Sequence, residues 1–202
     1  QVTVEYDGDI PVRINTFLIS TQHIEEASLD DVKKIVKEVM INTAKEYNMN
    51  TDFKILINPT GRFVIGGSIG DAGVTGRKII ADTYGGYAHH GGGAFSGKDP
   101  SKVDRSAAYM ARKIAKDVLR NDFADKCEIQ LAYAIGVKEP VSIFVNCFGT
   151  NKVDEENIVK YIEENYDLTP KGIIEKLDLL NIQYSDTTVY GHFGKEYLNW
   201  EK

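Results

Sequence analysis

The sequence contains no apolar run long enough to cross a bilayer. Its longest apolar stretches, such as residues 17–19 and 141–145, have the length of a strand, whereas a membrane-spanning helix needs about 20 mostly apolar residues. We therefore expect no membrane segment and no membrane partner.

Cysteine is also scarce, and acidic residues outnumber basic ones. The only cysteines are Cys127 and Cys147, and a domain of this size needs no disulfide, which favours a reducing compartment and predicts a cytoplasmic location. The two cysteines could still be neighbours on paired strands. The net charge of −6 argues against a nucleic-acid partner, because phosphate backbones are bound by basic surfaces.

The charge is distributed unevenly along the chain. Between Gly61 and Arg105 there are six basic and four acidic residues, although the chain as a whole is acidic. A local positive segment in an acidic protein indicates a confined anionic ligand rather than an extended polyanion. The chain starts at Gln1, inside a strand pattern, with no initiator Met and no signal-peptide layout, so we expect residues upstream of it.

Periodic apolar residues predict the first half of the fold. Residues 1–6 and 12–20 alternate as strands on either side of Asp7-Gly8-Asp9, which is a hairpin pattern. Ser28 and Asp31 resemble a capping box before an amphipathic helix that should end near Tyr47. A further strand follows at residues 53–57.

Glycine is concentrated in the middle of the chain. Twelve of the 18 glycines fall between Gly61 and Gly97, which predicts backbone shaped for close approach or positive φ. The pattern then predicts a helix beginning near Pro100 or Ser101, strands at 128–134 and 141–148, a helix at 155–166, and a short last helix capped by Thr169. We therefore expect an α/β (α+β two-layer) fold of repeated β-β-α modules, with mixed sheets covered by helices on one face.

Two motif matches suggest other enzymes. Residues 92–98 fit the first seven positions of a P-loop, but Asp99 stands where Ser or Thr should hold magnesium and no strand leads into the loop. Residues 66–70 match the nucleophile-elbow pattern, with Ser68 as nucleophile and His192 as a possible base. That pattern needs a helix directly after the serine, and residues 71–76 are poor helix formers. These departures disfavour both alternatives.

Other polar residues in the glycine-rich segment allow more than one interpretation. His89 and His90 have no Cys or His at metal-ligand spacing, so a zinc site is disfavoured. Asp104, in the first turn of the expected helix, could be an ordinary partner of the helix dipole. Beside several cations it could equally hold Mg²⁺ against phosphate oxygens.

Three segments carry a specific resemblance to one family. They are residues 58–67 (NPTGRFVIGG), residues 70–78 (GDAGVTGRK) and residues 90–106 (HGGGAFSGKDPSKVDRS). Together they resemble S-adenosylmethionine synthetases, and the resemblance extends from residues 20–23 to residues 190–194. Ser68 departs from the pattern, because the family often has proline there. The family's N-terminal histidine motif and its methionine-contacting acidic and amide side chains are absent from this sequence.

The resemblance implies a reaction and roles for individual residues. The methionine sulfur attacks C5′ of ATP and expels the triphosphate, which is then hydrolysed to phosphate and pyrophosphate. Catalytic roles are implied for Arg77, Lys98 and Lys102, and Asp104 is implied to bind Mg²⁺. Contacts with methionine are implied for Asp71 and Lys102. The residues implied to contact ATP are Arg62, Phe63, Asp71, Arg77, Lys78, Ala94 and Lys98.

The resemblance also implies a domain plan and partners. Residues 1–60 would be the C-terminal part of the family's central domain, and residues 61–202 its C-terminal domain with the glycine-rich ATP loop. The family uses Mg²⁺ and K⁺, and it places its active sites at the interface of a homodimer or a dimer of dimers. Because the N-terminal half is not in this sequence, we expect this portion to be inactive alone. The alternatives are a ligand-binding fragment without turnover, or a serine hydrolase using Ser68.

Overall fold

The computed structural model describes residues 1–74 and 76–202. The chain divides into two compact units, Gln1–Gly73 and Val74–Lys202, and each is described by itself. Thr75, which belongs to one of the motifs quoted above, lies outside the described residues. Among the residues described, no helix combines the length and the apolar character that crossing a membrane requires.

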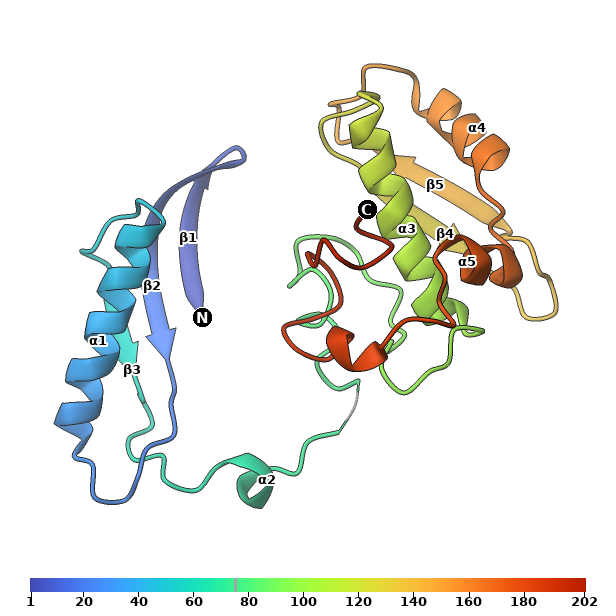
Figure 1. Ribbon diagram of the computed structural model, residues 1–202. Coiled ribbons are helices and arrows are strands. Elements are labelled where there is room, and N and C mark those ends of the chain that lie inside the picture. The colour runs from blue at the N-terminus through green and yellow to red at the C-terminus, as the bar shows by residue number, and fades with distance from the viewer. Residues whose placement is uncertain (75) are drawn as a thin grey trace. The chain divides into compact units, whose positions relative to one another are not determined.

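The first unit is a small mixed sheet packed on a long helix (Figure 1). Its elements are β1 (Val2–Asp7), β2 (Ile10–Ile19), α1 (Leu29–Glu46), β3 (Lys54–Ile57) and the four-residue α2 (Gly67–Gly70). β1 pairs antiparallel with β2, and β2 pairs parallel with β3. The parallel pair requires a crossover connection, which α1 provides.

Local sequence explains where these elements begin and end. The predicted hairpin turn is confirmed, and Gly8 takes the positive φ of +59° that such a turn demands. The predicted cap is confirmed as well, because the Ser28 Oγ accepts from the Asp31 amide at 3.1 Å. One cluster of buried apolar side chains in this unit comes from the sheet, from α1 and from the residue before β3: Ile14, Phe17, Met40, Ala44, Phe53 and Ile57.

The second unit packs its helices against a two-stranded antiparallel sheet. Its elements are α3 (Val103–Arg120), β4 (Glu128–Ala132), β5 (Ser142–Asn146), α4 (Glu155–Asn165), α5 (Pro170–Lys176) and the 3₁₀ helix η1 (Tyr184–Thr187). The paired residues Ile129 and Val145 belong to the apolar core that also includes α3 and α4, whereas Phe144 on the other face is 52% exposed. Both helices therefore cover the same face of this sheet.

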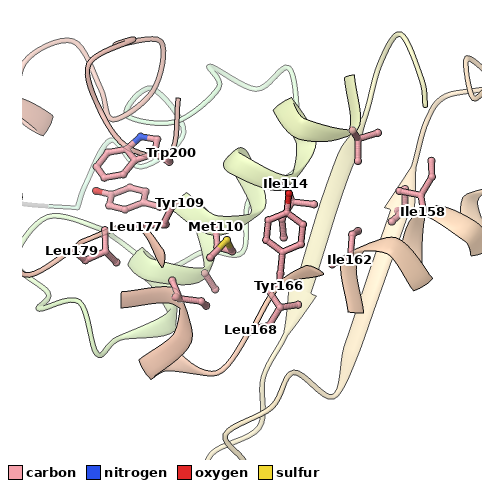
Figure 2. Close-up of a cluster of buried hydrophobic side chains, with 14 of the residues drawn as sticks. Tyr109, Met110, Ile114, Ile158, Ile162, Tyr166, Leu168, Leu177, Leu179 and Trp200 are labelled. Carbon is pink, nitrogen blue, oxygen red and sulfur yellow. The ribbon is translucent and has the colours of Figure 1, made fainter. Parts of the chain in front are cut away.

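The core of the second unit is centred on α3. Tyr109, Met110, Ile114 and Val118 have no exposed surface, because the apolar stripe predicted from the sequence faces inward. Figure 2 shows the side chains of Tyr109, Met110 and Ile114 beside labelled side chains of α4, of the segment after α5 and of the last residues of the chain. Trp200 stacks on Tyr109 with ring centroids 3.9 Å apart.

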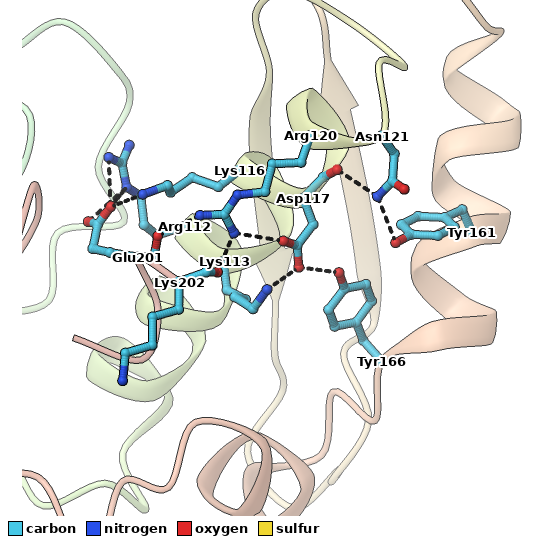
Figure 3. A network of polar contacts seen from close by, with 10 residues as sticks. All are labelled: Arg112, Lys113, Lys116, Asp117, Arg120, Asn121, Tyr161, Tyr166, Glu201 and Lys202. Atoms are coloured by element: carbon cyan, nitrogen blue, oxygen red, sulfur yellow. Dashed lines mark hydrogen bonds and ion pairs between the residues drawn. The ribbon is translucent and has the colours of Figure 1, made fainter. Parts of the chain in front are cut away.

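The C-terminal residues bind α3 through a network of hydrogen bonds and ion pairs. Glu201, with a side chain only 1% exposed, accepts from Arg112 at 3.0 Å and from Lys116 at 2.7 Å. Its burial opposes ionisation, but the bonds from Arg112 and Lys116 outweigh burial and lower the pKa of the carboxyl group. Figure 3 shows this carboxylate beside a second cluster around Asp117, which Lys113 and Tyr166 contact.

The predicted fold class is confirmed, with two differences of detail. α3 begins at Val103 rather than near Pro100, because Asp99 accepts bonds from the amide and the hydroxyl of Ser101 and holds the preceding residues in a turn. The second sheet is purely antiparallel rather than mixed. Glu128 and Asn146 are the paired residues at one end of this sheet. Cys127 precedes Glu128 and Cys147 follows Asn146, and both cysteines are free thiols.

Candidate functional site

Two glycines bring the glycine-rich segment against its neighbours. A Cβ on Gly93 would lie 2.3 Å from the Asp104 Cγ, and one on Gly76 would lie 2.6 Å from the Ala94 Cβ. Neither contact leaves room for a side chain. The loop that contains Ala94 is therefore in contact with both the start of α3 and the segment that carries Arg77 and Lys78.

The loop ends in a tight turn that presents Lys98. The Lys98 amide donates to the Phe95 carbonyl at 3.2 Å, and Gly97 at the third position has a φ of +86°, as a type II turn requires. The Lys98 ammonium donates to the Asp104 Oδ2 at 2.6 Å. The predicted cation and the predicted metal ligand are therefore in direct contact.

Arg105 supports the same turn from the buried side. Its Nη1 donates to the Lys98 carbonyl at 2.9 Å, and its guanidinium lies 4.4 Å from the centre of the Tyr184 ring. The residue is only 4% exposed, and its Nε finds no hydrogen-bond partner within residues 1–74 and 76–202. A buried positive charge thus lies directly beneath the loop.

Lys102 is the N-cap residue of α3 and points to a different carboxylate. Its ammonium lies 3.1 Å from the Asp99 Oδ2. Bonds from the hydroxyl and amide of Ser101, and then the contact with Lys102, hold the pKa of Asp99 well below its usual range. Asp99 is therefore a stable anion, and it occupies the position where a P-loop would have a hydroxyl.

A cavity of about 310 Å³ opens beside the loop. It is lined by residues of the 74–82 segment, of the loop and of the C-terminal segment, namely Val74, Gly76, Arg77, Lys78, Asp82, Ser96, Thr187, Thr188 and His192. Two predicted cations therefore share one wall with hydroxyl groups. Lys98, Lys102 and Asp104 are not among the lining residues; their side chains are 30%, 56% and 50% exposed.

His192 forms part of the cavity wall although the residue as a whole is only 2% exposed. Its Nδ1 lies 2.7 Å from the Tyr109 hydroxyl and its Nε2 lies 3.4 Å from the Ser96 Oγ. Burial, reinforced by the positive charge of Arg105, lowers the pKa of the ring to about 4. The imidazole is therefore neutral near pH 7.

Three predicted ATP or methionine contacts belong to the first unit. Arg62 donates to the Glu25 carboxylate at 3.1 Å. The Phe63 amide donates to the His23 Nε2 at 3.2 Å. Asp71 follows α2 and accepts from the Gly73 amide at 3.0 Å, which shapes a small turn.

The residues whose motifs suggested other enzymes do not have the surroundings that those enzymes require. Ser68 lies within α2, which ends at Gly70, so it does not lead into the long helix of a nucleophile elbow. His192 instead contacts Ser96. His89 binds the Glu128 carboxylate at 2.8 Å, and the His90 Nδ1 accepts from the Gly92 amide at 2.8 Å.

Sequence reasoning missed the contribution of His192 and Arg105 to this site. The sequence assigns His192 no role except that of a possible hydrolase base, and it assigns Arg105 none beyond its charge. The sequence offers one weak indication, which is the glycine before the histidine. The structure explains it, because a Cβ on Gly191 would lie 2.9 Å from the Asp82 carbonyl oxygen. Such a close backbone approach holds Gly191 against Asp82, next to the buried His192.

Comparison with known proteins decides the family. The sequence model of the S-adenosylmethionine synthetase C-terminal domain matches residues 65–202, and that of the central domain matches residues 1–63. The chain belongs to the S-adenosylmethionine synthetase family. The resemblance read from the glycine-rich motifs is thereby confirmed.

Two relatives show how much of the protein this chain represents. It is 57% identical over 203 residues to an S-adenosylmethionine synthase of Mesoplasma florum, covering 100% of this chain and 54% of the relative. It is 55% identical over 205 residues to an S-adenosylmethionine synthase of Finegoldia magna, covering 52% of that relative. The chain thus spans about half the length of the curated relatives it matches. The cavity, the loop and α3 all fall within the part matched by the synthetase C-terminal domain.

Proposed function

We propose that this chain is the part of an S-adenosylmethionine synthetase that binds the polyphosphate of ATP, and that the full-length protein forms S-adenosylmethionine from ATP and L-methionine. The observation that carries the proposal is the cavity whose wall includes Arg77 and Lys78. Around the loop, the second unit adds Lys98 and Lys102. Because the chain spans about half the length of its relatives, the reaction is proposed for the full-length protein.

The chemistry explains why the site needs fixed cations more than a base. The methionine sulfur is a neutral nucleophile, so its attack on C5′ requires little proton transfer. The leaving triphosphate carries several negative charges, and groups positioned before the reaction stabilise such charge most effectively. Arg77, Lys78, Lys98 and Lys102 would bind the polyphosphate and neutralise it, first as it departs and then during its hydrolysis to phosphate and pyrophosphate.

The family resemblance also implies ligand contacts for residues of the first unit. Arg62, Phe63 and Asp71 would contact ATP, and Asp71 and Lys102 would contact methionine. Ala94 and Lys98 would reach ATP bound mainly by a neighbouring subunit of a homodimer or a dimer of dimers, so that active sites lie at the interface. The free thiols support a cytoplasmic location.

Asp104 suits a magnesium ion that arrives with its substrate. Within residues 1–74 and 76–202, no three His, Cys, Asp or Glu side chains gather as a self-sufficient metal site. Mg²⁺ is, however, commonly held by one or two carboxylates together with substrate phosphates. The half-exposed Asp104 carboxylate, already balanced by Lys98, fits that arrangement. Bound there, Mg²⁺ would neutralise phosphate oxygens; K⁺ is proposed from the family alone.

The role of Lys98 can be tested in the full-length protein. Lys98→Ala should reduce formation of the sulfonium product on the order of a hundredfold or more, as removal of one preorganised donor does elsewhere. Product would be measured by mass spectrometry with ATP, methionine, Mg²⁺ and K⁺ present. The matched control is Lys171→Ala, because Lys171 is 84% exposed on α5 and pairs only loosely with Glu175 at 3.7 Å. Near-normal turnover of Lys98→Ala would remove Lys98 from the mechanism.

A further inference from the structure

The loop that carries Lys98 needs support from outside itself. Residues 91–98 include four glycines, and glycine lowers the cost of alternative backbone conformations. A cation that acts on a leaving group must nevertheless be held in place, because a shift of about 1 Å can cost a hundredfold in rate. Some neighbouring side chain must therefore restrict the loop.

Ser96 is the position where such support would be most effective. It is the second residue of the Phe95–Lys98 turn, so holding its side chain orients the turn and the lysine at its end. Phe95 is buried, with its ring 5.1 Å from His192 and edge-on to it. The Ser96 hydroxyl lies 3.4 Å from the His192 Nε2.

His192 is itself fixed by several other segments. Its ring contacts Tyr109 of α3, its amide donates to the Asp82 carbonyl at 3.1 Å, and its carbonyl accepts from the Trp200 Nε1 at 2.9 Å. A neutral imidazole offers one donor and one acceptor. Because hydroxyls can donate or accept, the ring can bond Tyr109 and Ser96 at the same time.

We propose that His192 is a positioning residue of the synthetase, which holds Ser96 and thereby sets the position of Lys98. The inference rests on the proposed function, because Lys98 is taken to act on the departing triphosphate. Arg105 restrains the same turn through the Lys98 carbonyl. Packing alone would be served by an apolar side chain at 192, whereas the imidazole reaches a loop hydroxyl on the cavity wall.

Two substitutions distinguish the contact made by the His192 Nε2 from the contact made by its Nδ1. In His192→Gln the amide can reach approximately where Nε2 lies, so the contact with Ser96 is kept. In His192→Asn the amide lies nearer the Nδ1 position, so the contact with Tyr109 is kept and that with Ser96 is lost. Tyr109→Phe and Ser96→Ala remove the corresponding partners.

The expected result is measured on the full-length protein. His192→Asn and Ser96→Ala should each lower kcat about tenfold to a hundredfold, with little change in the KM for methionine. His192→Gln and Tyr109→Phe should stay within a few-fold of the parent protein. The double variant His192→Asn/Ser96→Ala should lose no more than either single variant, because both remove one interaction.

A second readout does not depend on turnover. Hydrogen exchange at the amides of residues 94–98 should accelerate in His192→Asn and Ser96→Ala but not in His192→Gln. Equal effects of His192→Asn and His192→Gln on kcat and on exchange would overturn the inference, as would additive losses in the double variant. If the parent protein forms no sulfonium product, the proposed function fails instead, while the exchange measurement still decides whether His192 holds the loop.

Discussion

His192 shows how one buried side chain couples the site to pH. Its pKa falls from the ordinary value of 6.5 to about 4 because burial disfavours the charged ring, with Arg105 and Lys195 acting in the same direction and Asp82 opposing them. In the unfolded chain the ring takes up a proton as pH falls through about 6.5. In the folded chain it stays neutral until about pH 4.

This difference predicts a loss of stability in acid. The contribution of His192 to the free energy of unfolding is fully present above pH 6.5. It is lost as pH falls towards 4, and the loss is at most about 3 kcal/mol. Trp200 is the only tryptophan, so its fluorescence can follow urea unfolding of the second unit at pH 7 and at pH 4.5. His192→Gln should show a smaller drop in unfolding free energy between these pH values than the parent protein. Equal drops would show that His192 is not the group responsible.

At the scale of single elements, α5 depends on a hydroxyl cap. The Thr169 Oγ1 accepts from the Gly172 amide at 3.1 Å, Pro170 occupies the first turn, and Ile173 and Leu177 are fully buried. The cap satisfies an amide that has no partner within the helix. It therefore stabilises a short helix whose apolar face completes the core around α3.

Removing this cap should cost about 1 kcal/mol. We expect Thr169→Ala to lower the unfolding free energy by that amount, measured by urea titration with Trp200 fluorescence. Thr169→Ser retains the oxygen and should lose much less. A full loss in Thr169→Ser would show that the methyl group of the threonine, rather than its hydroxyl, is what matters.

At the scale of the whole second unit, Glu201 links the end of the chain to α3. The carboxylate balances Arg112 and Lys116 and also accepts from the Gly194 amide at 2.8 Å. Removing one partner from a buried ion pair leaves uncompensated charge, which typically costs about 3–5 kcal/mol. Trp200, the neighbour of Glu201, stacks on Tyr109 and donates to the His192 carbonyl at 2.9 Å, so the ion pair holds the segment that contacts His192.

Glu201→Gln should therefore destabilise the second unit by about 3 kcal/mol. The matched control is Glu196→Gln, an exposed glutamate five residues earlier, which should change stability by less than about 0.5 kcal/mol. Thermal or urea unfolding followed by Trp200 fluorescence measures both variants. Similar stabilities of the two variants would contradict a structural role for the buried carboxylate.

Much of the fold could be predicted because its determinants are local. The apolar stripe of α3, the alternation in β2, the Gly8 turn and the Ser28 and Thr169 caps depend on residues a few positions apart. Helix and strand periodicities are local properties of the backbone. The start of α3 was misplaced because a short polar cluster between Asp99 and Ser101 offers the backbone an alternative set of bonds.

The sequence by itself determined the family, the order of the strands and longer helices, and the set of charged residues that the proposed chemistry requires. Only the tertiary structure decided which of those residues meet. Lys98 pairs with Asp104 within one loop-and-helix junction, but Ser96 and His192 are 96 positions apart. Contacts at such separation are formed by packing of the whole unit, in which burial, close glycine approaches and the C-terminal ion pair act together, and no local pattern encodes them.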